Sequence, residues 1–338
     1  MTNLSIGVDI GGSHISAALV NPKGKIITKK VISFLKPPDG KKGLLIIEQL
    51  IKEVIYNRPT KLNSIIGIGI SCPGSVDVRN GVVLADSPNL IGWKGTKIKQ
   101  ALETTFKIPV LIDNDANLAA WGEKYWGAGK NNRNFICLTL GTGVGGGIII
   151  NDKIYHGSHF YAGEIGHMKI KSDPPDRKSP PDRVSCRAGS RAGGPLCSCG
   201  SRGCLEALVG APAIVREFIK PKTISTVSFQ ITAKTVFDAA RRGNKIARKV
   251  VYQTACYLGY AIASLVNIFD PEIIVIGGGI AQAGKIIFQP ISNIVKTNVM
   301  MHPFRVLRIV PAKLGENAGI LGAAALVFDT IRQRRIPA

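Results

Sequence analysis

Short apolar runs separated by turn residues open the chain, and they predict a strand-rich beginning. The predicted strands are Leu4–Asp9, Ile15–Val20, Lys25–Val31 and the buried run Ile65–Ser71. A glycine turn at Gly11-Gly12-Ser13 joins the first two strands, and apolar residues at helical spacing predict a helix over Gly43–Tyr56. The order strand, strand, strand, helix, strand is typical of a ribonuclease-H-like core.

A very similar order begins again further along the chain. A strand is predicted at Pro109–Ile112 and a helix at Asp115–Trp126, and the second series then starts. Its predicted elements are a strand at Phe135–Leu140, a glycine-rich turn at Gly141–Gly147 and a strand at Ile148–Ile150. Two tandem copies of one architecture would form a two-domain α/β protein with a cleft between the domains.

The remaining segments fall into periodic and irregular parts. A helix is predicted at Asn244–Phe269, a strand at Ile273–Ile276 and a closing helix at Ala318–Arg334. The stretch Ser172–Gly194 is rich in proline, arginine, serine and glycine and has no hydrophobic period. We therefore expect it to be an irregular surface loop.

Composition sets the size and the charge of the molecule. With 338 residues, of which 45% are hydrophobic, the chain is long enough for two domains with separate cores. It has 44 Lys and Arg residues against 22 Asp and Glu, a net charge of +22 that favours contact with polyanions. Because the basic residues are scattered and show neither an aromatic-interleaved strand nor a recognition-helix pattern, we expect no specific nucleic-acid partner.

Neither a membrane nor an oxidising compartment is indicated. The first residues, MTNLSIGVDIGG, lack the basic and apolar regions of a signal peptide, and the apolar run Ile273–Ile276 ends at a glycine cluster. Seven cysteines, three of them within residues 197–204, favour a thiolate metal site over a disulfide framework. We expect a cytoplasmic protein without membrane contact.

Three glycine clusters are candidates for phosphate binding. Asp9 precedes the turn Gly11-Gly12-Ser13, so a carboxylate and backbone N–H groups are available to a phosphate and its Mg²⁺. Gly141-Thr142-Gly143 opens a run of glycines and adds a hydroxyl, but it fits neither a P-loop nor a dinucleotide fingerprint. Gly277-Gly278-Gly279 follows a buried strand and either contacts an adenosine or only turns the chain into a helix.

Three crowded cysteines predict a zinc site. Cys197, Cys199 and Cys204 lie within eight residues, and tetrahedral zinc needs one more ligand. His167 is the best candidate, with Cys186 as a competitor. The other three cysteines lie in apolar runs and are expected in the core, namely Cys72, Cys137 and Cys256.

Six motifs, in this order, resemble those of the ROK (repressor, open reading frame, kinase) family. The resemblance runs from residue 6 to about residue 325, and its last two motifs are the most specific. The motifs are Asp9-Ile10-Gly11-Gly12-Ser13, Ser87-Pro88-Asn89-Leu90, Asn114-Asp115-Ala116-Asn117, Gly141-Thr142-Gly143, Gly163-Glu164-Ile165-Gly166-His167-Met168 and CSCGSRGCLE at 197–206.

The resemblance implies an actin-like or hexokinase-like fold and a kinase that uses ATP with Mg²⁺ to phosphorylate a hexose, with glucose as the leading acceptor. It makes Asp115 the catalytic base, and His167 would bind zinc through one nitrogen and sugar through the other. The implied sugar contacts are Gly74, Asn89, Asn114, Asp115, Glu164, His167 and Glu206. The implied cofactor contacts are Asp9, Gly11, Gly12, Ser13, Gly141, Thr142, Gly143, Gly277, Gly278 and Gly279. The implied ligands of a structural zinc ion are His167, Cys197, Cys199 and Cys204.

The chemistry of phosphoryl transfer agrees with these roles. The acceptor hydroxyl needs a carboxylate to take its proton, and sugar hydroxyls need carboxylate and amide partners that accept and donate hydrogen bonds. Asn117, by contrast, is expected to be only a helix cap. The predicted domains are 1–117 with 318–338, and 118–317 with a zinc-binding lobe at about 164–210.

Two departures from the family pattern and several alternatives accompany this assignment. His14 stands where many members have lysine, and the Ser172–Gly194 insertion is longer than expected.

Fructose, mannose, allose, N-acetylglucosamine and N-acetylmannosamine remain alternative acceptors, and polyphosphate an alternative donor. A ROK transcriptional repressor would carry an N-terminal helix-turn-helix module, for which a first strand beginning near Leu4 leaves no room. The family also implies a homodimer or a higher homo-oligomer.

Overall fold

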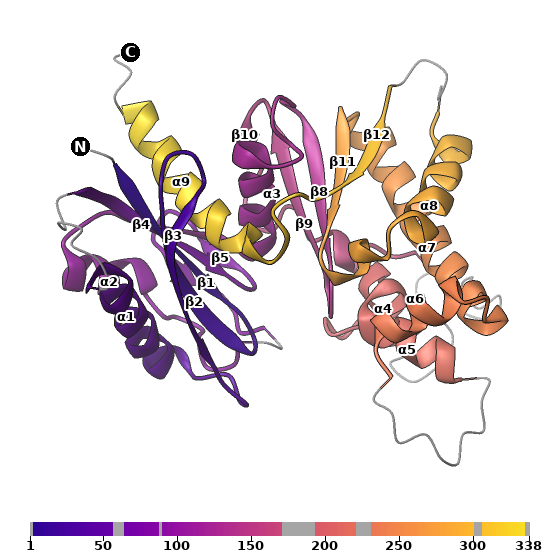
Figure 1. Cartoon of the computed structure of the whole chain (residues 1–338), viewed down its shortest axis with the longest axis horizontal. Helices are drawn as coiled ribbons and strands as arrows, with labels where there is room; N and C mark the ends of the chain where they lie inside the picture. Colours follow the sequence, from indigo (N-terminus) through magenta and orange to yellow (C-terminus); the bar gives the residue numbers. More distant parts are fainter. Residues whose placement is uncertain are drawn as a thin grey trace, which may run out of the picture. The chain divides into compact units, whose positions relative to one another are not determined.

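Two five-stranded sheets with the same order of strands form the framework of the chain (Figure 1). The computed structural model describes residues 3–56, 64–87, 90–170, 193–220, 231–300 and 306–334. The first sheet has the spatial order β3 (Ile26–Ser33), β2 (His14–Val20), β1 (Leu4–Ile10), β4 (Ile65–Cys72), β7 (Val110–Asn114). The second has the order β10 (Lys153–Ile154), β9 (Val144–Ile150), β8 (Phe135–Leu140), β11 (Ile273–Gly277), β12 (Arg308–Pro311). This repetition confirms the predicted tandem α/β architecture.

Strand directions bring the ends of three strands to one edge of the first sheet. β1 is antiparallel to β2 and parallel to β4, and β4 is parallel to β7. In this register Asp9 pairs with Ser71, and Ser71 pairs with Asp113. Ligands of open α/β sheets bind beyond the carboxyl ends of parallel strands, so this edge is where a site is expected.

The chain divides into two compact units. One contains Met1–Leu138, Gly146–Gly163 and Ala312–Ala338, and the other contains Thr139–Gly145 and Glu164–Pro311. The domain limits expected from the sequence, at 117/118 and 317/318, are not the limits of these two units, and they stay a prediction.

In the first unit, one face of the sheet packs against helices α1 (Gly40–Tyr56) and α2 (Ile98–Phe106), as Figure 1 shows. Alternate residues of β1 point to this face, because side chains alternate along a strand. Ile6 and Val8 are fully buried there with Ile47 and Leu50 of α1 and Leu102 of α2. A short two-stranded sheet, β5 (Val76–Asp77) with β6 (Val82–Val83), also belongs to this unit.

The other face of the same sheet carries glycines, because helix α9 (Ala318–Arg334) lies close against it. Gly7 of β1 and Gly69 of β4 are register partners. A Cβ at Gly7 would lie 2.1 Å from the Ile320 carbonyl oxygen, and one at Gly69 would lie 1.9 Å from that of Ala323. Only glycine therefore lets the backbone of α9 approach the sheet this closely.

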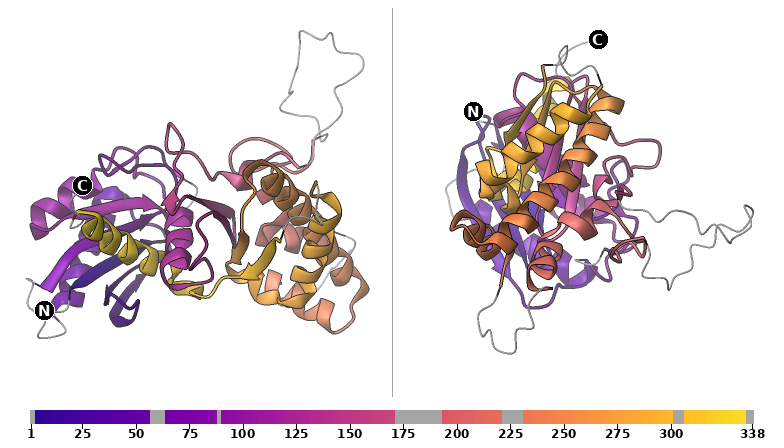
Figure 2. Two further views of the ribbon diagram at one scale, coloured as in Figure 1. Left: turned by 90° about the horizontal axis from the view of Figure 1, so that it is seen from above. Right: turned by 90° about the vertical axis from the view of Figure 1, so that its right-hand side faces the viewer.

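The second unit contains five described α-helices. They are α4 (Leu205–Val209), α5 (Ala211–Ile219), α6 (Ala233–Arg241), α7 (Lys245–Phe269) and α8 (Lys285–Asn298). The long helices α7 and α8 run side by side (Figure 2), and a Cβ at Gly259 of α7 would lie 2.6 Å from Ile294 of α8. Apolar residues along α7, such as Val251, Leu258 and Ile262, are buried.

The predicted elements are found, with one correction in the glycine-rich segment. Helix α3 (Asp115–Trp126), strand β8 and helix α9 have the predicted bounds. The predicted turn Gly141–Gly147 is too long, because β9 already begins at Val144. A Cβ at Gly147 would lie 2.6 Å from the carbonyl oxygen of Ala116, so this glycine allows close packing against α3 rather than contact with a phosphate.

Two further expectations concern the chain as a whole. Most of the predicted Ser172–Gly194 loop lies outside the described residues. Among the residues that the structure does describe, none of the helices combines the length and apolar character needed to span a membrane.

The crossing of α3 and α9 predicts an unusual response to alanine at Gly322. A Cβ at this position would lie 1.7 Å from the Leu118 carbonyl oxygen. Replacing glycine by alanine in an unobstructed helix stabilises it by up to about 1 kcal/mol. For Gly322→Ala we expect the opposite sign, a loss of roughly 1–3 kcal/mol from overpacking. Urea unfolding followed by circular dichroism measures this, and a raised midpoint would contradict the described crossing.

Candidate functional site

The junction between β7 and α3 orders two of the predicted sugar-site residues. Asn114 is the N-cap of α3, and its side-chain oxygen accepts hydrogen bonds from the backbone N–H groups of Ala116 (2.9 Å) and Asn117 (3.2 Å). Its amide nitrogen donates to the carbonyl oxygen of Gly74 at 2.9 Å. Asp115 begins the helix and also accepts from Ala116 N–H, at 2.8 Å. The structure thus brings Gly74, Asn114 and Asp115 together.

Asp113, which the sequence motifs did not single out, lies buried behind this junction. Its Oδ1 accepts hydrogen bonds from the Asn114 N–H (2.7 Å) and from the side-chain amide of Asn117 (3.0 Å). Its Oδ2 lies 2.7 Å from Nε2 of His156. Asn117 is therefore a partner of Asp113 rather than the predicted helix cap, a role that Asn114 takes.

The pKa of His156 follows from this contact. Partial burial alone would lower the pKa of the imidazole, but the hydrogen bond to Asp113 and the negative charge of that carboxylate raise it above its ordinary value. No aspartate is adjacent to His156 in the sequence, so no local motif pointed to the pair.

Asp86 holds the backbone of Gly92, Trp93 and Lys94 in place. Its carboxylate accepts hydrogen bonds from the backbone N–H groups of Gly92, Trp93 and Lys94 at 2.8 to 2.9 Å. These bonds hold the pKa of Asp86 below its usual value, and the bond from Gly92 has the largest effect. Asn89 lies outside the described residues, and its sugar contact stays a prediction.

The first glycine turn lies at the carboxyl end of β1. Asp9 accepts a hydrogen bond from the Ser71 hydroxyl at 2.5 Å, and burial raises the pKa of Asp9 despite this bond. Gly11 N–H donates to the His14 carbonyl at 2.9 Å, which closes the turn that contains Gly12 and the exposed Ser13. His14, the residue that departs from the family pattern, has Nδ1 3.2 Å from Ser13 Oγ.

The other two glycine clusters lie close together in the second unit. Gly278 has a positive φ of 82°, and a Cβ there would lie 2.2 Å from the carbonyl oxygen of Leu140, which directly precedes Gly141-Thr142-Gly143. A Cβ at Gly141 or at Gly279 would meet no described atom within 4 Å, so the surroundings of both are open. Backbone N–H groups and open space at adjacent strand ends suit a phosphate chain.

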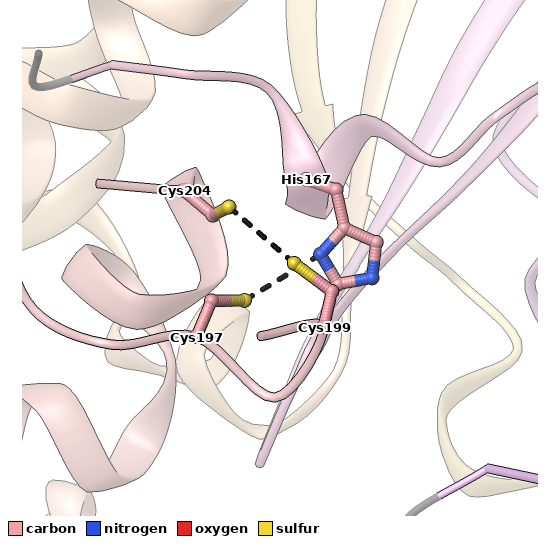
Figure 3. Close-up of side chains that lie close together, drawn as sticks. All are labelled: His167, Cys197, Cys199 and Cys204. Carbon is pink, nitrogen blue, oxygen red and sulfur yellow. Dashed lines mark hydrogen bonds between the residues drawn. The ribbon is translucent and has the colours of Figure 1, made fainter. Parts of the chain in front are cut away.

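His167, Cys197, Cys199 and Cys204 converge on one point (Figure 3). Their ligand atoms all lie within 4.8 Å of one another. His167 Nδ1 lies 3.5 Å from the sulfur of Cys197, and the sulfurs of Cys199 and Cys204 lie 3.7 Å apart. Cys186, the competing ligand, lies outside the described residues.

These separations fit a tetrahedral zinc ion. Zn–S and Zn–N bonds of normal length place two sulfurs about 3.8 Å apart, and a sulfur and a nitrogen about 3.5 Å apart. Burial raises the pKa of the Cys197 thiol to about 12, so binding of a metal ion would have to release its proton. The ammonium group of Lys169 lies 3.3 Å from the Cys204 sulfur and would offset part of the charge of three thiolates.

The cluster of His167 and the three cysteines adjoins two further predicted sugar-site residues of the same unit, Glu164 and Glu206. The second nitrogen of His167, Nε2, lies 3.7 Å from a carboxylate oxygen of Glu164. Glu206 accepts hydrogen bonds from the Ser198 hydroxyl (2.5 Å), which lies between two of the cysteines, and from the Val144 N–H (3.1 Å). Glu206 therefore joins the cysteine loop to the start of β9.

The remaining cysteines divide between core and surface. Cys72 and Cys137 are buried as predicted, and burial raises the pKa of both thiols. Cys256 is partly exposed on α7, so its assignment to the core is wrong.

Similarity to known proteins extends along the whole chain. The chain is 35% identical to the glucokinase of Halalkalibacterium halodurans, over 95% of this chain and 94% of that protein. It is 30% identical to the xylose repressor of Caldicellulosiruptor bescii, over 96% of this chain but 78% of the repressor. A ROK family glucokinase from Streptomyces griseus, solved in complex with glucose and AMPPNP, matches it with a TM-score of 0.77 at 31% identity, over 97% of this chain and 100% of that one.

The two sheets have the same order of strands, and the junction of β7 and α3, which carries Asp113 and Asp115, lies at the edge of the first sheet. These features define a hexokinase-like α/β fold. The model of the ROK family matches residues 5–330, and the chain belongs to this family.

Proposed function

We propose that this protein is a glucokinase that transfers the γ-phosphoryl group of ATP to glucose and forms glucose 6-phosphate. The observation that carries the proposal is its similarity, over nearly the whole chain, to a glucokinase solved with glucose and AMPPNP. Within the described residues, Asn114 and Asp115 share one ordered junction. Glu164 and Glu206 contact His167 and Cys197, two members of the cysteine cluster. Amides and carboxylates of this kind suit the hydroxyls of a hexose.

In the proposed reaction, Asp115 takes the proton of the acceptor hydroxyl while the hydroxyl oxygen forms a bond to the γ-phosphorus and the bond to the leaving ADP breaks. The residues proposed to contact ATP are Asp9, Gly11, Gly12, Ser13, Gly141, Thr142, Gly143, Gly277, Gly278 and Gly279. Mg²⁺ supplied with ATP would offset the negative charge of the phosphates. The residues proposed to contact the sugar are Gly74, Asn89, Asn114, Asp115, Glu164, His167 and Glu206.

A sugar-responsive regulator is the weaker alternative. The xylose repressor of C. bescii is less similar to this chain than the glucokinase of H. halodurans is, and the match leaves 22% of the repressor uncovered, since it covers 78%. Retention of Asp115 and of the glycine turns favours an enzyme. The cytoplasmic location and the assembly into a dimer or larger oligomer stay predictions.

A panel assay tests the activity. ADP release, coupled to NADH oxidation, is measured with glucose, fructose, mannose, allose, N-acetylglucosamine and N-acetylmannosamine, and glucose phosphorylation is measured separately with polyphosphate as donor. We expect the highest kcat/KM with glucose and ATP, because specificity is set by differences in transition-state binding between acceptors. A preference for another hexose would mean that glucose is not the main substrate. If no hexose is phosphorylated, the kinase assignment is overturned.

We also propose that His167, Cys197, Cys199 and Cys204 hold one structural zinc ion per chain. Elemental analysis should find one zinc in the wild type and in Cys256→Ser, a matched control outside the cluster, and less in Cys199→Ser. Because zinc would fix His167 and the loop before Glu206, its loss should lower both the melting temperature and the affinity for sugar. A wild type that is metal-free and fully active would contradict this proposal.

A further inference from the structure

One buried carboxylate in the first unit, which contacts a partly exposed histidine, has no part in the reaction proposed above. The side chain of Asp113 is only 3% exposed, and Nε2 of His156 lies 2.7 Å from its Oδ2. A buried carboxylate is stable only when donors satisfy its oxygens, since an unpaired buried charge is costly. Besides His156, the Asn114 N–H and the Asn117 amide donate to this carboxylate, both at Oδ1.

Those donors connect Asp113 with the residues of the proposed chemistry. Asn114 N–H belongs to the same residue whose side chain caps α3 and reaches Gly74, and Asp115 is the next residue. The orientation of the Asp113 carboxylate therefore fixes the peptide group that leads into Asn114. Since His156 is the donor at Oδ2, it selects one orientation of this carboxylate.

His156 is itself held in place from several sides. Its carbonyl oxygen accepts a hydrogen bond from the Ala162 N–H at 3.1 Å, which closes the loop from 156 to 162. Its ring packs edge-on against Phe160, with ring centroids 6.2 Å apart, and the guanidinium of Arg79 lies over the same phenyl ring at 5.5 Å. The imidazole is therefore anchored by its backbone, by its stacking partner and by Asp113.

We propose that His156 is a positioning residue for phosphoryl transfer, which orients Asn114 and Asp115 through the carboxylate of Asp113. This inference rests on the proposed kinase function. The imidazole touches neither sugar nor nucleotide in this role. It keeps the catalytic junction in one conformation, and small misplacements of reacting groups reduce turnover strongly.

Two substitutions separate positioning from simple stability. His156→Leu removes the donor to Asp113, whereas His156→Gln keeps an N–H group at about the distance of Nε2 from the backbone. We expect kcat with the best sugar of the panel to fall roughly 10- to 100-fold in His156→Leu, as for reacting groups displaced by about 1 Å. The KM for ATP should stay within about twofold, because the substitution alters the acceptor side of the reaction. His156→Gln should regain most of the lost kcat.

Melting temperature and zinc content of each variant serve as controls. A kcat near wild type in His156→Leu overturns the inference, and so does an equal loss of kcat in His156→Leu and His156→Gln. If His156→Leu does not fold, His156→Asn, whose shorter amide withdraws the donor from Asp113, takes its place with the same expected results. A wild type without turnover would overturn the proposed function and this inference together, whereas a normally active His156→Leu would overturn the inference alone.

Discussion

The need to satisfy one buried carboxylate determines the local structure around the proposed base. Asp113 is the last but one residue of β7, at the edge where β1, β4 and β7 finish together, and its oxygens accept hydrogen bonds from Asn114, Asn117 and His156. With Asp113 held in this way, Asn114 can cap α3 and Asp115 can begin it. The proposed catalytic junction is thus the direct continuation of a buried polar network.

A second constraint acts in the other unit, on the irregular loop that contains Cys197, Cys199 and Cys204. This loop must be held in place with little apolar core of its own. The cysteine loop contributes only a small buried cluster, Cys197, Cys204 and Ala207. Four ligand atoms within 4.8 Å of one another could bind a metal ion, which would hold this loop where a larger core is absent. Ser198 of the same loop donates a hydrogen bond to Glu206, and Val144 of β9 donates another, so the proposed zinc would stabilise a binding residue as well as the fold.

The sequence could predict elements with a clear period and residues within contiguous motifs. Helices α3 and α9 and strand β8 have strong patterns and the predicted bounds, whereas β10 and β12 are edge strands of two and four residues with little pattern. Glycine can either leave room for a phosphate or allow two elements to pack closely, and the sequence alone does not distinguish these uses. For this reason Gly147 is wrongly assigned to the predicted turn, although it lies in β9 and packs against α3. The pair Asp113–His156 could not be predicted, because its partners meet only through the fold, 43 positions apart.

Asp115 as the acceptor of the sugar proton is the central element of the proposed mechanism. Asp115→Asn keeps the size and hydrogen-bonding capacity of the side chain but removes its basicity, and sugar Kd by calorimetry and kcat by coupled assay are measured on the same preparation. We predict a nearly unchanged Kd and a kcat lower by roughly 10² to 10⁴. Normal sugar binding with a kcat near that of the wild type would contradict this mechanism.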